Sequence, residues 1–224
     1  AELLKHADVH HAGQPVVLLD ESRERVYLAQ SGLIPGAGAP TLPTHKTPMT
    51  LTSQERRLAD GAKELKLRFE SASVNGVKLV KTYLLRRGAY DITIEHEVIN
   101  QSATAVAPQL YVQLVRDGNK PEGESSFYST FTGPAVYTNA KKYQKVEFSD
   151  IEKNKVEMEK QSQDGYVAMV QHYFASAWWL PNNLQRDLFA RKIDNNLYAV
   201  GMIAALPSLE AGKSQTLAAH LFIG

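Results

Sequence analysis

The chain of 224 residues contains no cysteine. Disulfide bonds, thiolate metal sites and cysteine nucleophiles are therefore excluded together, although this absence leaves the cellular compartment open. The chain also lacks an excess of charge of either sign, because 25 lysines and arginines are balanced by 24 aspartates and glutamates, for a formal net charge of +1. Without a strong overall field, the composition does not favour nucleic acid or an anionic membrane surface as a partner.

Long uninterrupted hydrophobic runs are missing as well. The longest nearly uncharged stretch, Asp164 to Pro181, is interrupted by Gln171, His172 and Ser176. It is too short for a membrane span, which needs about 20 predominantly apolar residues. No signal peptide is found, and the chain stops directly after an apolar run typical of a strand. We therefore expect a piece of a longer protein whose targeting signals lie outside it.

The motifs of common active sites are absent. No G-x-S-x-G pattern occurs, no glycine-rich loop precedes a predicted helix, and Ser125-Ser126 has no recognisable base beside it. Glu95 and Glu97 share the charged side of a predicted strand, where a solvated surface is the ordinary interpretation. Basic doublets such as Arg86-Arg87 and Lys141-Lys142 lack the interleaved aromatics that single-stranded nucleic acid needs. The sequence thus identifies no catalytic, cofactor-binding or metal-binding residue.

What the chain does contain is an aromatic stretch from Asp164 to Pro181 that includes both tryptophans. So many aromatic side chains must be covered by other elements, because an exposed patch of that size is unusual in a soluble protein. Residues 166–170 and 175–180 are typical of buried strands, with 171–174 as a turn or one helical turn between them. We therefore expect this stretch to be sealed between two layers of sheet.

The clearest strand signals lie in the first half of the chain. Apolar and charged residues alternate at 65–70, and Asn75-Gly76 is typical of a tight hairpin turn because both residues tolerate positive φ. The pattern predicts a meander that continues through strands at 77–86 and 90–99, followed by a fourth strand at 106–115.

Elsewhere the signals are shorter. The first fifteen residues show little pattern, and seven glycines and prolines between Ser31 and Pro48 predict a long loop. Residues 150–163 are predicted to be mostly irregular. Further strands are predicted at 16–19, 26–29, 127–132, 141–148, 155–160, 187–193, 197–205 and 215–223, with Gly133-Pro134 ending the strand at 127–132. These strands predict an all-β chain, a large antiparallel two-sheet sandwich that forms a single domain over residues 1–224.

Histidines are the remaining candidates for chemistry. His10 and His11 are adjacent, so they would point to opposite sides of a strand and are interpreted as solvated residues. His96 lies on the apolar side of its strand, where a core or groove histidine satisfied by one hydrogen bond is the more ordinary interpretation. His172, inside the aromatic stretch, is the more interesting candidate, but no carboxylate lies at close spacing.

Several motifs occur in an informative order: QSGL at 30–33, LRRGAY at 85–90, FTGPA at 131–135, Lys142-Tyr143, GYVAMVQHYF at 165–174 and Ala177-Trp178. Together they resemble the large periplasmic domain, P1, of the YidC membrane protein insertase family, over nearly the whole chain. The resemblance implies a β-supersandwich related to the galactose-mutarotase fold. It also implies a place between the first and second transmembrane helices of an insertase, with both ends of the domain trimmed in this chain.

The same resemblance implies a non-catalytic domain at the periplasmic face of the bacterial inner membrane, without a cofactor. Such a domain is largely dispensable for insertion and assists insertion and folding of nascent membrane proteins. It contacts the Sec translocon through SecF, by rough alignment in the segment 87–137, and it carries a cleft suggested to receive an extended peptide. Edge strands of a sandwich make peptide addition physically reasonable.

The alternative is a carbohydrate-binding or mutarotase-like enzyme domain, which rests on analogy of fold alone. Sugar epimerisation needs a general acid and a general base that face each other across the ring, commonly His with Glu. On one strand, Glu95 and His96 would face opposite ways. We therefore predict no mutarotase turnover, and an acceleration of aldose epimerisation that is lost in His172→Ala would contradict this prediction.

Overall fold

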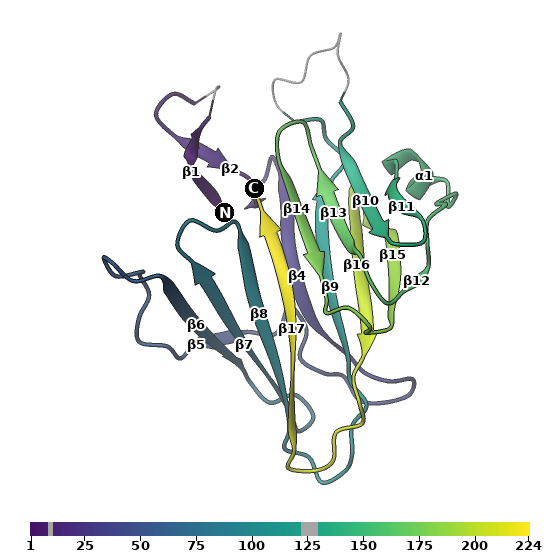
Figure 1. Ribbon diagram of the computed structural model, residues 1–224. Helices are drawn as coiled ribbons and strands as arrows, with labels where there is room; N and C mark the ends of the chain where they lie inside the picture. Colours follow the sequence, from purple (N-terminus) through teal and green to yellow (C-terminus); the bar gives the residue numbers. More distant parts are fainter. Residues whose placement is uncertain (9–10, 122–129) are drawn as a thin grey trace.

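Two antiparallel sheets face each other in the computed structural model, which describes residues 1–8, 11–121 and 130–224 (Figure 1). The larger sheet has nine strands, in the order β11 (Lys142–Lys145), β10 (Gly133–Thr138), β13 (Tyr166–Val170), β14 (Ala175–Trp179), β17 (Ser214–Ile223), β8 (Asp91–Asn100), β7 (Val77–Arg86), β6 (Glu64–Ser71) and β5 (Met49–Leu51). The smaller sheet has six, in the order β12 (Gln161–Ser162), β15 (Arg186–Asp194), β16 (Leu197–Ala205), β9 (Gln109–Asp117), β4 (Val26–Ile34) and β3 (Asp20–Glu21). The predicted all-β two-sheet sandwich is confirmed.

Two small elements lie beside the sheets. A hairpin of β1 (Glu2–Ala7) and β2 (Pro15–Val17) pairs only with itself among the described residues. A single turn of helix, α1 (Phe148–Glu152), packs near β15, and the centre of its Phe148 ring lies 4.6 Å from that of Tyr198 on β16. Figure 1 shows β5, β6 and β7 fanning out beyond the smaller sheet, so this end of the larger sheet is covered on fewer sides.

The strands predicted within the aromatic stretch exist as β13 and β14, but the prediction that the stretch is sealed between two sheets is wrong for one of its faces: Trp179 points away from the smaller sheet, and Tyr173 in the turn is 82% exposed. The other face closes the core. Trp178 is 2% exposed, and its indole N–H donates to the carbonyl of Gln113 in β9, 3.1 Å away. Val167 and Met169 on β13 are fully buried beside it. Alternation along each strand places every second side chain toward the other sheet, which produces this apolar layer.

The hairpin predicted at Asn75-Gly76 is present between β6 and β7. Both residues have positive φ, 49° and 79°. A Cβ atom at Gly76 would lie 2.6 Å from the Cβ of Ser102, so glycine is required there by space as well as by backbone conformation. The predicted strand at 106–115 exists as β9, but it pairs with β4 and β16 in the smaller sheet and does not continue the meander.

The predicted loop from Ser31 to Pro48 is wrong over its first four residues, because β4 runs on to Ile34. The sequence predicts a loop there because glycine usually interrupts a strand. In the structure, a Cβ at Gly32 would lie 2.6 Å from the hydroxyl of Tyr111 and 2.8 Å from the backbone nitrogen of His45. Gly32 therefore lets another segment approach β4 closely.

Three further predictions are wrong. The first fifteen residues contribute β1, and Gly133-Pro134 begins β10 where the sequence predicts the end of a strand. No strand forms at 155–160. That segment follows α1 and runs beside β11, held by a bond from the backbone N–H of Glu159 to the side-chain oxygen of Gln144, 3.2 Å. The strand predicted at 127–132 lies mostly outside the described residues.

Candidate functional site

His96 belongs to a small polar cluster buried between the sheets. It is fully buried, and its Nε2 lies 2.8 Å from the hydroxyl of Ser31 on β4. Lys81 lies directly opposite on β7 and is 6% exposed, and its amino group donates to the Ser31 carbonyl at 2.7 Å. The interpretation of His96 as a core histidine with one hydrogen bond is thereby confirmed.

Burial controls the titration of both groups. It lowers the pKa of His96 to about 3, helped by the positive charge of Lys81. Burial also lowers the pKa of Lys81 to about 8. Desolvation disfavours the charged form of a base, so both groups favour the neutral state more than they would in water.

The cluster lacks the partner that acid/base chemistry on a sugar would need. Glu95 and Glu97 lie on the opposite face of β8, where Glu95 is exposed and Glu97 pairs with Arg68 at 3.3 Å. Nearby, the hydroxyl of Tyr111 accepts the backbone N–H of His45 at 3.0 Å. No carboxylate of the described residues therefore faces His96 or Lys81 from within the sandwich.

The other histidine candidates lie apart from one another. His172 is exposed in the turn between β13 and β14, with Nδ1 2.7 Å from the hydroxyl of Thr130. His11 is also exposed and pairs with Asp8 at 3.4 Å, while His10 lies outside the described residues. Among the residues that the structure describes, no three His, Asp or Glu side chains gather in a way that could hold a metal ion.

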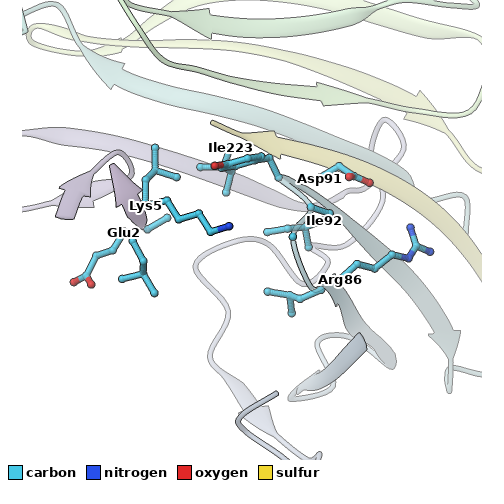
Figure 2. A pocket seen from close by; sticks show the side chains of 13 residues that line it. Glu2, Lys5, Arg86, Asp91, Ile92 and Ile223 are labelled. Carbon is cyan, nitrogen blue, oxygen red and sulfur yellow. The ribbon is translucent and has the colours of Figure 1, made fainter. Parts of the chain in front are cut away.

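A cleft of about 370 Å³ lies between β1 and the turn from β7 to β8 (Figure 2). Its apolar walls come from both sides and from the end of β17: Leu3, Leu4, Leu85, Ile92 and Ile223. In Figure 2, Lys5 extends across the cleft toward Ile92, whereas Glu2 and Arg86 point away from it. The cleft therefore combines apolar walls with one ammonium group in its middle.

Strand β1 presents an open edge along this cleft. Residues 1–5 all line the cleft, and β1 has β2 on one side and no strand on the other within the described residues. Leu4 is 81% exposed, which is unusual for a leucine in a strand. The hairpin is anchored at its far end, where His6 lies 3.3 Å from the hydroxyl of Tyr90 and edge-on to the Phe174 ring.

Sequence reasoning missed this cleft because β1 has no alternating pattern, and only Leu3 among its residues is buried. The spacing of Leu3 and Leu4 carries no periodic signal. An available hint was the contrast between two apolar residues and the charged residues around them.

The segment 87–137, expected to contact a partner, does not form one surface. It begins at the cleft with the turn 87–90, continues through β8 in the larger sheet, and then enters β9, whose residues from Leu110 to Asp117 are all buried. Among its described residues, the exposed ones lie in the turns and loops between strands and on the outer face of β8, where Glu95 is exposed; residues 122–129 lie outside the description. The accessible parts of this segment are therefore scattered over separate places.

No helix in the described ranges has the length and apolar character that a membrane crossing requires.

Comparison with known proteins identifies relatives along the entire chain. The family model of the YidC periplasmic domain matches residues 1–224. A membrane protein insertase YidC from Janthinobacterium sp. (strain Marseille) is 48% identical over 223 residues, which is 100% of this chain and 38% of that protein. The corresponding protein of Cupriavidus necator is 46% identical over 223 residues, 100% of this chain and 39% of that protein. The chain thus spans less than two fifths of the length of these relatives.

Solved structures of similar fold are distant in sequence. A galactose mutarotase related enzyme from Lactobacillus acidophilus aligns with a TM-score of 0.52 and 10% identity, over 97% of this chain and 85% of that one. The Slr1438 protein from Synechocystis sp. PCC 6803 aligns with a TM-score of 0.51 and 11% identity, over 95% of this chain and 85% of that one. At such low identity the likeness establishes a mutarotase-like sandwich and says nothing of activity.

Proposed function

Because the chain belongs to the YidC periplasmic domain family, we propose that it is a single, non-catalytic recognition domain on the periplasmic face of an inner-membrane insertase. In this role it assists insertion and folding by holding extended segments of nascent membrane proteins and by contacting the Sec translocon. The observation that carries the proposal is the cleft along the open edge of β1.

An extended peptide fits this cleft by strand addition. Unpaired backbone groups on the free side of β1 offer hydrogen bonds that do not depend on the peptide sequence, and the apolar walls accept alternate side chains. A volume of about 370 Å³ accommodates a few side chains and leaves no room for a folded element. Such a site suits a client that is still unfolded when it reaches the insertase.

The ammonium group of Lys5 adds an electrostatic component. It extends over the cleft toward Ile92, so it can donate to a peptide carbonyl or pair with an acidic side chain (Figure 2). The exposed Leu4 supplies an apolar contact next to it. We expect segments that combine apolar residues with an acidic residue to bind most tightly.

The proposed SecF contact joins the cleft at one place. Gly88, Ala89 and Tyr90 line the cleft and belong to the segment 87–137, and Tyr90 is 41% exposed. We place the translocon contact on this turn, because β9, further along the segment, is buried. A partner seated on this turn would narrow the entrance to the cleft, which couples the two proposed contacts.

Binding of a fluorescent extended peptide to the 224-residue chain tests the proposal. We expect Leu4→Asp to weaken binding at least tenfold, because a carboxylate would replace the apolar contact. Ile193→Asp is the matched control, since Ile193 is also an exposed aliphatic residue, 43% exposed, and lies on β15 away from the cleft. Equal binding by both variants would place the peptide elsewhere or show that the chain does not bind it.

Co-purification with SecF tests the second contact. Tyr90→Ala should reduce the amount of SecF recovered, whereas Tyr173→Ala should not, because Tyr173 is 82% exposed in a turn outside the segment 87–137. Unchanged recovery with Tyr90→Ala would move the contact away from this turn.

A further inference from the structure

A row of aromatic side chains crosses the outer face of the larger sheet. Cross-strand partners in an antiparallel sheet point to the same face. On five strands that are adjacent in the sheet, the residues paired across the strands are Tyr143 on β11, Tyr137 on β10, Tyr166 on β13, Trp179 on β14 and His220 on β17. These five residues are called the aromatic row. With neighbouring strands about 4.8 Å apart, the row is about 19 Å long.

The row faces away from the smaller sheet. Trp178, the neighbour of Trp179 in β14, points into the core and bonds to β9, so Trp179 points outward. Tyr143 is 44% exposed and the other four residues are half-buried. Five aromatic rings thus lie side by side on one partly accessible sheet face, and exposed apolar surface of this kind can mark an interaction site.

The rings of the row stack on one another in pairs. Tyr137 and Tyr166 have centroids 5.3 Å apart and planes 8° apart, and Trp179 and His220 have centroids 5.1 Å apart and planes 11° apart. These separations are too short for rings lying side by side in one plane, so the rings stand upright with their edges outward. A sugar or a nucleobase needs a free ring face for stacking, and in each of these two pairs the partner ring covers one of the two faces.

Lysines gather at one end of the row. Lys141, Lys142 and Lys145 on or beside β11 are exposed, and none of them forms an ion pair within the described residues. Lys145 lies on the same face as Tyr143, with its amino group 5.1 Å from the centre of the Phe131 ring, whereas Lys142 is the cross-strand partner of the buried Thr138 and lies on the opposite face. Glu147 is exposed two residues further on, which leaves a local excess of positive charge.

The nearest carboxylates along β10 and β13 are engaged locally. Asp164 accepts the backbone N–H of Asn139 at 2.9 Å, and Glu159 accepts the hydroxyl of Thr138 at 2.7 Å. The lysines are therefore left to interact with an external anion. The overall charge of +1 conceals this local excess.

We propose that the aromatic row, together with Lys145, rests on an anionic lipid surface. Upright tyrosine and tryptophan rings place an apolar body between their neighbours and a polar tip outward, which suits the headgroup region of a bilayer. An exposed lysine beside them attracts acidic headgroups. Four of the five strands of the row, all but the edge strand β11, are paired on both sides, so this sheet face offers a peptide few unpaired backbone groups. The surface is separate from the cleft, so the proposal stands without the peptide-binding function.

Flotation of the 224-residue chain with vesicles tests this proposal, with phosphatidylcholine alone compared with phosphatidylcholine and phosphatidylglycerol at about two to one. We expect binding only to the anionic vesicles and a decrease with added salt. The variant Lys145→Glu should lower the partition coefficient by about fivefold or more, since a lysine near such a surface contributes about fivefold. Lys213→Glu carries the same charge change on another exposed residue and should change binding less than about twofold.

The two tryptophans provide a second measurement. Brominated lipid should quench Trp179 and leave Trp178 unaffected, because the two side chains point to opposite faces of β14. In Trp179→Phe, which keeps a ring in the row, quenching should disappear. Absence of quenching in the unaltered chain, or equal loss of binding in both lysine variants, would overturn the proposal. Dimerisation without lipid that buries Trp179 would also overturn it, as would tight binding of a soluble peptide across the row.

Discussion

Trp178 and Trp179 are neighbours in β14, but their surroundings are opposite. The indole of Trp178 is sealed in the core and bonded to β9, whereas that of Trp179 lies on the outer face and stacks on His220. The composition of the strand does not distinguish them, because only the second sheet decides which face is covered. The inner face of the larger sheet therefore determines stability, and the outer face is free to serve recognition.

The same contrast separates the charged groups of the larger sheet. On the inner face, Lys81 and His96 are buried and both bond to Ser31. On the outer face, Arg68 pairs with Glu70 at 3.2 Å and with Glu97 at 3.3 Å in partial contact with water. Buried charges are costly and solvated pairs contribute little, so substitutions on the two faces should differ in size and in pH dependence.

The largest expected effect comes from truncating the tryptophans one at a time. Trp178→Ala should lower the free energy of unfolding by about 3–5 kcal/mol, because it opens a cavity and leaves the carbonyl of Gln113 without its donor. Trp179→Ala should cost about 1 kcal/mol, the value of an exposed aromatic contact. Urea denaturation followed by circular dichroism measures both values. Similar losses in the two variants would show that the outer face is also covered.

The next effect is an acid sensitivity that arises from His96. Its pKa is about 3 in the folded chain, against 6.5 for an unperturbed histidine. Between these values the unfolded chain binds a proton that the folded chain does not, so stability falls as pH falls from 6.5 toward 3. At about 1.4 kcal/mol per pH unit, the loss reaches about 3 kcal/mol near pH 4.5.

His96→Gln serves as the control for this acid sensitivity. Glutamine keeps a hydrogen-bonding group near Ser31 but does not titrate, so the variant should lose this share of the pH dependence while the carboxylates contribute theirs as before. Denaturation series from pH 7 to pH 4 on both proteins measure the difference. Identical slopes would mean that water reaches His96 in the folded chain.

Much of the fold is predictable from local pattern, and the exceptions have physical causes. The alternation at β6 and the turn at Asn75-Gly76 act within a few residues, so the sequence shows them directly. The strand through Gly32 is not predictable from the local sequence. Glycine is required there because the hydroxyl of Tyr111 and the backbone of His45 lie too close for a Cβ atom, and both are distant from Gly32 in sequence. Close approach between segments leaves no trace in a local window.

Neither candidate surface could be predicted from sequence alone. Alternation shows that Tyr166 and Val170 share a face of one strand, but the aromatic row exists only through the register between five strands. The cleft depends on how β1 is placed against the turn at Gly88. The burial of His96, by contrast, could be predicted from sequence, because a histidine in line with the apolar residues of an alternating strand is expected to face the core.

A smaller effect is expected from Lys81, whose pKa burial lowers to about 8 from 10.5. Lys81→Met should raise the free energy of unfolding at pH 7 by about 1–2 kcal/mol, because removing a buried cation saves more than the lost bond to the Ser31 carbonyl costs. Between pH 8 and 10.5 the unfolded chain binds the extra proton, so the unaltered chain should become more stable as pH rises. The variant should not show this increase, and denaturation at pH 7 and pH 10 distinguishes the two. A large destabilisation at both pH values would instead indicate that Lys81 holds the sheets together.

The smallest effect is expected on the outer face of β6, where Arg68 joins Glu70 and Glu97, and where hydrogen bonds from Lys78 and then Arg68 lower the pKa of Glu70. Arg68→Gln should cost less than about 1 kcal/mol, since the Arg68 side chain is 42% exposed and water screens its pairs. The difference should shrink further in high salt, which weakens exposed pairs and leaves buried groups nearly unaffected. Denaturation at low and high salt, with Lys81→Met measured alongside, provides the comparison. A salt-independent loss for Arg68→Gln would mean that this part of the outer face is covered, and the division between a stabilising inner face and an open outer face would then fail at β6.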